Sequence, residues 1–154
     1  MAIMATLQQI DLALFDKVFC FGRDNKAMAK GAIAFSRSGD GYLQLLTPAM
    51  VWLSESVLAP TYVFALAAAM LAERGAYFVL KNTLKRLRPC DLRKNLKSLI
   101  AASDKFSFPS GHTSAAFCFS TITVIPFGGV YTVMFIWASL VGASRVVIGV
   151  HYPG

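Results

Sequence analysis

Charged residues are scarce in this sequence, and a long stretch of it contains none at all. Asp, Glu, Lys and Arg make up 15% of the 154 residues, whereas soluble domains usually contain about 25%. None of the four occurs in the 39 residues from Phe106 to Ser144. As a helix this stretch would extend about 58 Å, enough to cross a hydrocarbon core of about 30 Å twice. The shortage of charge therefore indicates a membrane protein; the alternative is a buried helical hairpin in a soluble protein.

Cysteine and histidine are also rare, which excludes several kinds of site. The three cysteines, Cys20, Cys90 and Cys118, are far apart and show neither a zinc-ligand spacing nor a disulfide framework. The carboxylates do not form a cluster typical of a magnesium site. We therefore expect no metal and no cofactor, and no nucleic acid as a partner. The two histidines, His112 and His151, become the first candidates for chemistry.

The apolar runs predict an all-α, multi-pass bundle of transmembrane helices. Pro60 separates two of these runs, and the turn Pro126-Phe127-Gly128-Gly129 separates two more. We expect membrane helices at residues 42–58, 61–80, 112–125 and 130–144. Glu73 and Arg74 lie inside the second of them, where charges are costly and normally face a partner or water. For these two residues an ion pair that supports the structure is the favoured interpretation, ahead of direct chemistry.

Residues 1–40 differ from the rest and form a predicted segment of their own. Apolar residues recur there at helical spacing, with charged residues off that stripe. The stripe consists of Leu7, Ile10, Leu14, Val18 and Phe21. An amphipathic helix on the membrane surface is the preferred interpretation, and packing against the bundle is the alternative. We therefore divide the chain into an interfacial segment, 1–40, and a membrane catalytic domain, 41–154.

Counting the spans brings three distant segments to one face of the membrane. Two crossings from the turn at Gly41 return the chain to the same side at Lys81, and two more return it there at Arg145. Residues 81–88, 110–112 and 145–151 should therefore lie together, although up to 70 positions separate them. This expectation depends on topology alone.

The converging segments carry residues suited to binding and attacking a phosphoryl group. Ser110 is a good N-cap, and Gly111 allows a ligand to approach the first turn of the helix, whose free N–H groups favour anions. Lys81, Arg88 and Arg145 would add three cations that stabilise charge on phosphoryl oxygens. One histidine could attack phosphorus and the other could protonate a leaving oxygen. Each feature alone also has a structural explanation: a capped helix, or a basic loop that sets topology or binds lipid headgroups.

Taken together, the motifs resemble the signature of the type 2 phosphatidic acid phosphatases. Its three parts are Lys81 with six residues to Arg88-Pro89, then Pro109-Ser110-Gly111-His112, then Ser144-Arg145 with five residues to His151. The order and the spacing within each part agree with the family. The resemblance implies a helical fold of the phosphatase and haloperoxidase type, a metal-independent reaction and a membrane lipid phosphate or polyprenyl pyrophosphate as substrate. Family substrates include phosphatidic acid, phosphatidylglycerol phosphate, undecaprenyl pyrophosphate and lipid A phosphates.

The resemblance also implies roles for individual residues. His151 would be the nucleophile that forms a phosphohistidine, and His112 the acid for the leaving group. Lys81, Arg88 and Arg145 would hold the phosphate, together with Ser110 and the backbone N–H of Gly111. In the family an Asp follows the nucleophile four residues later, a position beyond Gly154, and we therefore expect the sequence to be truncated.

Location and alternatives follow from the same resemblance. Basic residues on the site side would place the site in the cytoplasm by the positive-inside rule. Bacterial relatives mostly act on the outer face, and we expect the outer face of the inner membrane here. One alternative function is a catalytically impaired protein that binds lipid or phosphate. A relative of the vanadium haloperoxidases is another, although those enzymes are soluble and much larger.

Overall fold

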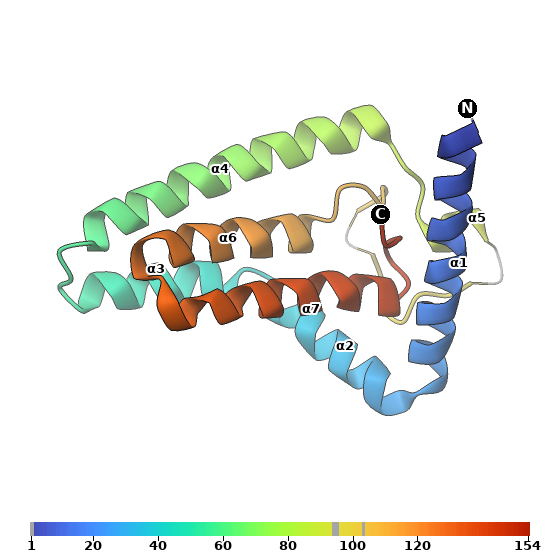
Figure 1. Cartoon of the computed structure of the whole chain (residues 1–154), viewed down its shortest axis with the longest axis horizontal. Coiled ribbons are helices and arrows are strands. Elements are labelled where there is room, and N and C mark those ends of the chain that lie inside the picture. The colour runs from blue at the N-terminus through green and yellow to red at the C-terminus, as the bar shows by residue number, and fades with distance from the viewer. Residues whose placement is uncertain (1, 94–95, 103) are drawn as a thin grey trace.

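Most of the described chain is helical, as the expected all-α fold class requires. The computed structural model describes residues 2–93, 96–102 and 104–154, and no strand occurs among them. The elements, drawn in Figure 1, are α1 (Ala2–Asp24), α2 (Lys26–Ser38), α3 (Tyr42–Leu53), α4 (Ala59–Leu84), α5 (Pro89–Leu92), α6 (Gly111–Phe127), the 3-10 helix η1 (Gly129–Val133) and α7 (Met134–Val147).

Helix α6 forms the centre of the bundle because it packs against both α4 and α7. Its side chains Ala116 and Phe119 are fully buried. Phe119 joins Tyr62 and Leu66 of α4, while Ala116 meets Ala138 and Val141 of α7. Small residues on α6 and α7 allow the two helices to approach closely, as is typical of helix pairs in membranes. Figure 1 shows α4, α6 and α7 running side by side along the long axis of the molecule.

Within the described residues, two helical segments are long and apolar enough to cross a membrane. They are Ala59–Leu84, which is α4, and Gly129–Val147, which joins η1 to α7. Few side chains of α4 are buried, and large apolar ones such as Phe64, Leu71 and Phe78 point outward. In water this exposure would be costly, whereas the hydrocarbon of a bilayer accommodates it. Two of the four expected crossings therefore have the length of a full span.

The other two expected spans are shorter than a full crossing. Helix α6 has 17 residues, which corresponds to about 25 Å. Helix α3 has 12 residues and ends at Leu53, so the expectation of a helix to residue 58 was wrong. The helix stops because Ser54 caps it and Glu55 adopts a left-handed backbone conformation with φ 53°.

The two N-terminal helices pack against α7 at the end of the bundle where the chain terminates. Phe15 and Phe19 of α1 are buried against Val146 and Tyr152, and Ala32 of α2 packs against Val147. Ion pairs from Arg86 to Asp11 and from Arg93 to Asp16 also hold α1 in place. Helix α1 therefore has a face bound to the bundle.

The apolar stripe of α1 lies largely outside that packed face. Ile10, Leu14 and Phe21 are exposed, Val18 contacts the core, and the side chain of Leu7 lies outside the described residues. Figure 1 shows α1 running across the end of the bundle. In a membrane-spanning bundle this direction would lie along the bilayer surface, which the exposed apolar residues suit. The division at residue 40 stays a prediction.

Candidate active site

The three motif segments meet at one end of the bundle, as the counting of spans predicted. Helix α4 ends there, α6 begins there, and α7 ends there (Figure 1). A cavity of about 360 Å³ opens at this end. Its lining includes the following polar residues: Asp40, Gln44, Arg74, Tyr77, Asp104, His112, Arg145 and His151. A second cavity of about 330 Å³ shares Arg145 and His151 with the first and is also lined by Ser110.

Lys81 lies in the last turn of α4, almost completely buried. Its ammonium group lies 2.8 Å from Oδ1 of Asp104 and donates to the carbonyl oxygen of Pro109 at 3.4 Å. The ring of Tyr77, one turn earlier, lies 4.6 Å from the same nitrogen. These contacts fix the ammonium beside the Pro109 turn that leads into α6. Lys81 therefore links the first two motifs directly.

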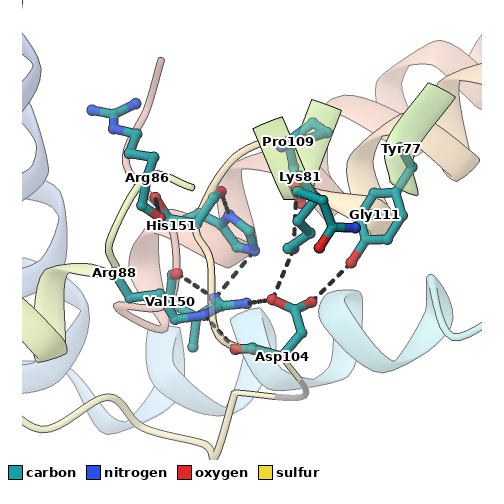
Figure 2. A network of polar contacts seen from close by, with 12 residues as sticks. Tyr77, Lys81, Arg86, Arg88, Asp104, Pro109, Gly111, Val150 and His151 are labelled. Carbon is teal, nitrogen blue, oxygen red and sulfur yellow. Dashed lines mark hydrogen bonds and ion pairs between the residues drawn. The ribbon is translucent and has the colours of Figure 1, made fainter. Parts of the chain in front are cut away.

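Arg88 is the most enclosed cation of the site, with 2% of its surface exposed. Pro89 follows it and begins α5, which fixes the backbone on that side. The guanidinium donates to the carbonyl oxygen of Val150 at 2.5 Å and to the carboxylate of Asp104 at 2.6 Å. Its Nη1 atom lies 3.4 Å from Nε2 of His151. Arg88 thus connects the first motif to the third (Figure 2).

His151 is held as a neutral imidazole with one defined tautomer. Its Nδ1 atom hydrogen-bonds the carbonyl oxygen of Ser107, and because a carbonyl can only accept, the proton is on Nδ1. Nε2 is therefore unprotonated and faces Arg88. Burial, and then the positive charges of Arg88 and Arg145, lower the pKa of His151 to about 3. A free electron pair at Nε2 is thus present throughout the physiological pH range.

The second motif forms the N-terminus of α6. Ser110 is its N-cap and accepts from the backbone N–H of Thr113, which confirms the predicted cap. A side chain on Gly111 would meet Tyr77, because a Cβ there would lie 2.9 Å from the ring. His112 hydrogen-bonds Oδ1 of Asp40 through Nε2 at 2.8 Å, and this nitrogen carries the proton because a carboxylate accepts. His112 and Ser110 line different cavities, which share Arg145 and His151 in their linings.

Arg145, in the last turn of α7, brings a third buried cation to the site. It has 3% of its surface exposed, and Nη1 donates to the hydroxyl of Ser36 at 2.5 Å. Within the described part of the chain, its buried Nε has no hydrogen-bond partner. An unpaired buried donor of this kind costs free energy unless a ligand accepts from it.

Asp104 is one of two acidic residues of the site that motif reasoning missed. Its carboxylate contacts Lys81, Arg88 and the hydroxyl of Tyr77, which donates at 2.9 Å (Figure 2). Burial raises its pKa, but the hydrogen bonds from Lys81, Arg88 and Tyr77 outweigh this effect and hold the pKa at about 2. One signal was available in the sequence: Asp91 and Asp104 are the only acids between Lys81 and Arg145. Asp40, the partner of His112, was also missed.

Glu73 and Arg74 were expected to take part in a structural ion pair, and they pair with each other, with 2.9 Å between Nη2 of Arg74 and Oε2 of Glu73. Arg74 also lies over the ring of Tyr77, 4.5 Å from its centre, and lines the first cavity. The pair therefore lies at the edge of the site. It gives two charges on α4 the partners that their position requires.

Comparison with known proteins agrees with these motifs and with the fold. The structure of LpxE from Aquifex aeolicus superposes with a TM-score of 0.78 at 24% identity, covering 92% of this chain and 82% of that one. The structure of the first transmembrane PAP2 type phosphatidylglycerolphosphate phosphatase from Bacillus subtilis superposes with a TM-score of 0.73 at 22% identity, covering 96% and 76%. Residues 61–154 match the family described as the PAP2 superfamily. This match includes all three motifs and more than half of the sequence, so the chain belongs to the PAP2 superfamily.

Proposed function

We propose that this protein is a membrane phosphatase that hydrolyses a lipid phosphate or polyprenyl pyrophosphate through a phosphohistidine. The observation that carries the proposal is an excess of buried positive charge beside an unprotonated histidine nitrogen. Three cations are almost completely buried: Lys81, Arg88 and Arg145. The carboxylate of Asp104 contacts Lys81 and Arg88. Buried cations without matching anions are unfavourable unless a ligand supplies the negative charge. A phosphoryl dianion supplies it.

Binding of the phosphoryl group would use these cations and the start of α6. Lys81 and Arg88 already converge on one carboxylate oxygen, Oδ1 of Asp104, and a phosphate offers them the same kind of acceptor. The unpartnered Nε of Arg145 would donate to another oxygen of the phosphate. The N-terminus of α6 at Gly111 adds free backbone N–H groups and a favourable dipole. A role for Ser110 would require the phosphate to reach the boundary of the second cavity.

The proposed reaction has two steps that share one acid–base group. In the first, Nε2 of His151 attacks phosphorus and the bond from phosphorus to the leaving oxygen breaks. The leaving oxygen takes the Nδ1 proton of a His112 imidazolium, whose Nε2–H stays bonded to Asp40. In the second, water attacks the phosphohistidine and passes its proton to His112. The bond from phosphorus to Nε2 then breaks, the electron pair returns to nitrogen, and inorganic phosphate leaves. Asp40 would orient His112 in both steps.

The position of the site favours a substrate held in the membrane. The site lies at the end of α4 and α7, which belong to the two described segments long enough to span a bilayer. Phe78 and Leu84, which flank Lys81 in sequence, are exposed on the outside of the bundle. Acyl or prenyl chains could lie against such residues while the phosphate enters the cavity. We also propose that the site faces the outer side of the inner membrane.

Trapping of the phosphoenzyme tests the proposal most directly. The purified protein, in detergent micelles, is mixed with radiolabelled lipid phosphate and quenched in alkali, where phosphohistidine survives. We expect label on the wild type and none on His151→Ala, together with a loss of turnover of several orders of magnitude, as for other deleted nucleophiles. Labelling of His151→Ala would contradict the mechanism. A wild type that binds vanadate but neither labels nor turns over would indicate the phosphate-binding alternative.

A further inference from the structure

We propose that Asp104 determines the specificity of this site: its carboxylate occupies the binding position of the phosphoryl group, so that dianionic phosphomonoesters can displace it and monoanionic phosphodiesters cannot. This inference rests on the proposed function and goes beyond it, because it names the charge state of the substrate that the site accepts. It also assigns a task to a residue outside the three motifs.

The contacts of Asp104 are those that a phosphoryl group would make. Oδ1 lies 2.8 Å from the ammonium of Lys81 and 2.6 Å from Nη2 of Arg88. Oδ2 accepts from the hydroxyl of Tyr77 at 2.9 Å. Figure 2 shows the carboxylate between these three donors, with the ring of His151 next to the guanidinium of Arg88. A bound carboxylate in this position resembles a phosphate with two of its oxygens in place.

Asp104 also lies between the cations and the open part of the site. It lines the first cavity together with Arg145 and His151, whereas Lys81 and Arg88 do not line it. An entering phosphoryl group therefore meets Asp104 before it reaches either cation. The guanidinium that binds Asp104 through Nη2 approaches Nε2 of His151 through Nη1, at 3.4 Å. A ligand that takes the place of the carboxylate is thus brought next to the nucleophile.

Charge decides which ligands can take that place. A phosphodiester headgroup carries one negative charge, the same as the carboxylate it would displace, so the exchange gains little attraction. A phosphomonoester dianion carries a second negative charge. The guanidinium of Arg145 can pair with this charge, and its unpartnered Nε can donate a hydrogen bond to it. Membranes contain many anionic phosphodiester lipids, and a cationic pocket open to them would otherwise be occupied. Asp104 would keep the pocket free of them.

Displacement of the carboxylate does not require the bundle to open. Asp104 lies in the connection between α5 and α6, outside both helices, and its side chain is 32% exposed. A rotation of this side chain would carry the carboxylate towards the solvent. Ligands bind only during the fraction of time for which the site is open, which raises the apparent dissociation constant of every ligand. Removing the carboxylate should therefore tighten binding.

Asp104→Asn tests the inference, because it removes the charge and keeps the shape. The wild type and the variant, purified in detergent micelles, are titrated in mildly alkaline buffer, where orthovanadate is mainly the dianion. The two ligands are orthovanadate and short-chain phosphatidylglycerol, a phosphodiester. We expect the variant to bind both ligands about tenfold more tightly than the wild type, so that the phosphodiester, which binds too weakly to displace the carboxylate in the wild type, now occupies the site. Asp91→Asn is the matched control, because it makes the same change of charge at an exposed position of α5. The affinity for either ligand should not change in this variant.

Other outcomes overturn the inference. If Asp104 only holds Lys81 and Arg88 in place, Asp104→Asn lowers the affinity for both ligands or leaves both affinities unchanged. Should this variant fail to fold, Tyr77→Phe decides, because it removes one hydrogen bond to Asp104 and keeps all charges; we expect a gain of about two- to threefold for the phosphodiester. No gain in Tyr77→Phe would contradict the inference. A wild type that binds no vanadate would instead contradict the proposed function.

Discussion

Nε2 of His112 lies 2.8 Å from Oδ1 of Asp40, although the two residues are 72 positions apart. Asp40 belongs to the turn between α2 and α3, where Gly41 adopts φ 107°. The turn places the carboxylate over the start of α6. The ring of His112 is thereby fixed in a position that its own helix does not determine. Asp40 is thus a positioning residue in the proposed reaction.

His112→Ala should slow hydrolysis of a lipid phosphate by roughly 10²–10⁴-fold, the usual contribution of a general acid. Hydrolysis of a nitrophenyl phosphate should be slowed much less, because its leaving group needs no proton. Steady-state rates on both substrates measure the difference. Equal losses on the two substrates would show that His112 has another task.

Asp40→Ala should give the same pattern in a weaker form. The ring of His112 stays present but loses its orientation, so we expect a loss of roughly tenfold on the lipid phosphate and almost none on the nitrophenyl ester. The matched control is Asp24→Ala, an exposed acid at the end of α1. A purely structural role of Asp40 predicts equal losses on both substrates and a lower melting temperature.

Chelators should leave activity intact, and vanadate should inhibit it. The proposed chemistry neutralises phosphoryl charge with Lys81, Arg88 and Arg145, so it requires no divalent cation. Turnover is measured after dialysis against EDTA and then with added magnesium. Loss of turnover in EDTA, with recovery of turnover when magnesium is added, would contradict the proposed mechanism.

Acidification should destabilise the folded protein between about pH 6.5 and pH 3. The pKa of His151 is lowered to about 3 in the folded protein from the ordinary value of 6.5, so in this window the unfolded chain binds a proton that the folded one does not. Stability therefore falls as the pH falls through this range. His151→Gln removes this contribution, and its melting temperature in detergent should depend less on pH. An unchanged pH dependence would contradict the buried neutral state of His151.

The two ends of the bundle should face opposite sides of the membrane. Single cysteines at Lys97, on the site side, and at Val57, in the turn between α3 and α4, are introduced after Cys20, Cys90 and Cys118 are replaced. Both positions are exposed. We expect an impermeant thiol reagent to label position 97 in intact cells and position 57 only after permeabilisation. The reverse pattern would place the site in the cytoplasm, and labelling of both from one side would contradict the threading.

The motifs and their convergence were predictable from the sequence because they follow from local patterns and an even number of crossings. Ser110 as N-cap follows from a short-range rule, and the position of Glu73 and Arg74 inside an apolar helix predicts that each needs a partner, although not which one. Asp104 and Asp40 were not predictable in this way. Their partners lie on other helices, so no periodicity or spacing in one segment points to them. The early end of α3 at Leu53 was missed because hydropathy continues past the point where the backbone turns.

The acceptor that sets the tautomer of His151 is the backbone carbonyl of Ser107. Every amino acid carries this group, so no change of side chain at position 107 can delete it. The side chain matters indirectly: Ser107 is buried, and its hydroxyl donates to the carbonyl oxygens of Arg86 and Leu87, which supports the path of the loop. The interaction that orients the proposed nucleophile is therefore carried by the backbone, and a substitution at position 107 can disturb it only by moving the chain.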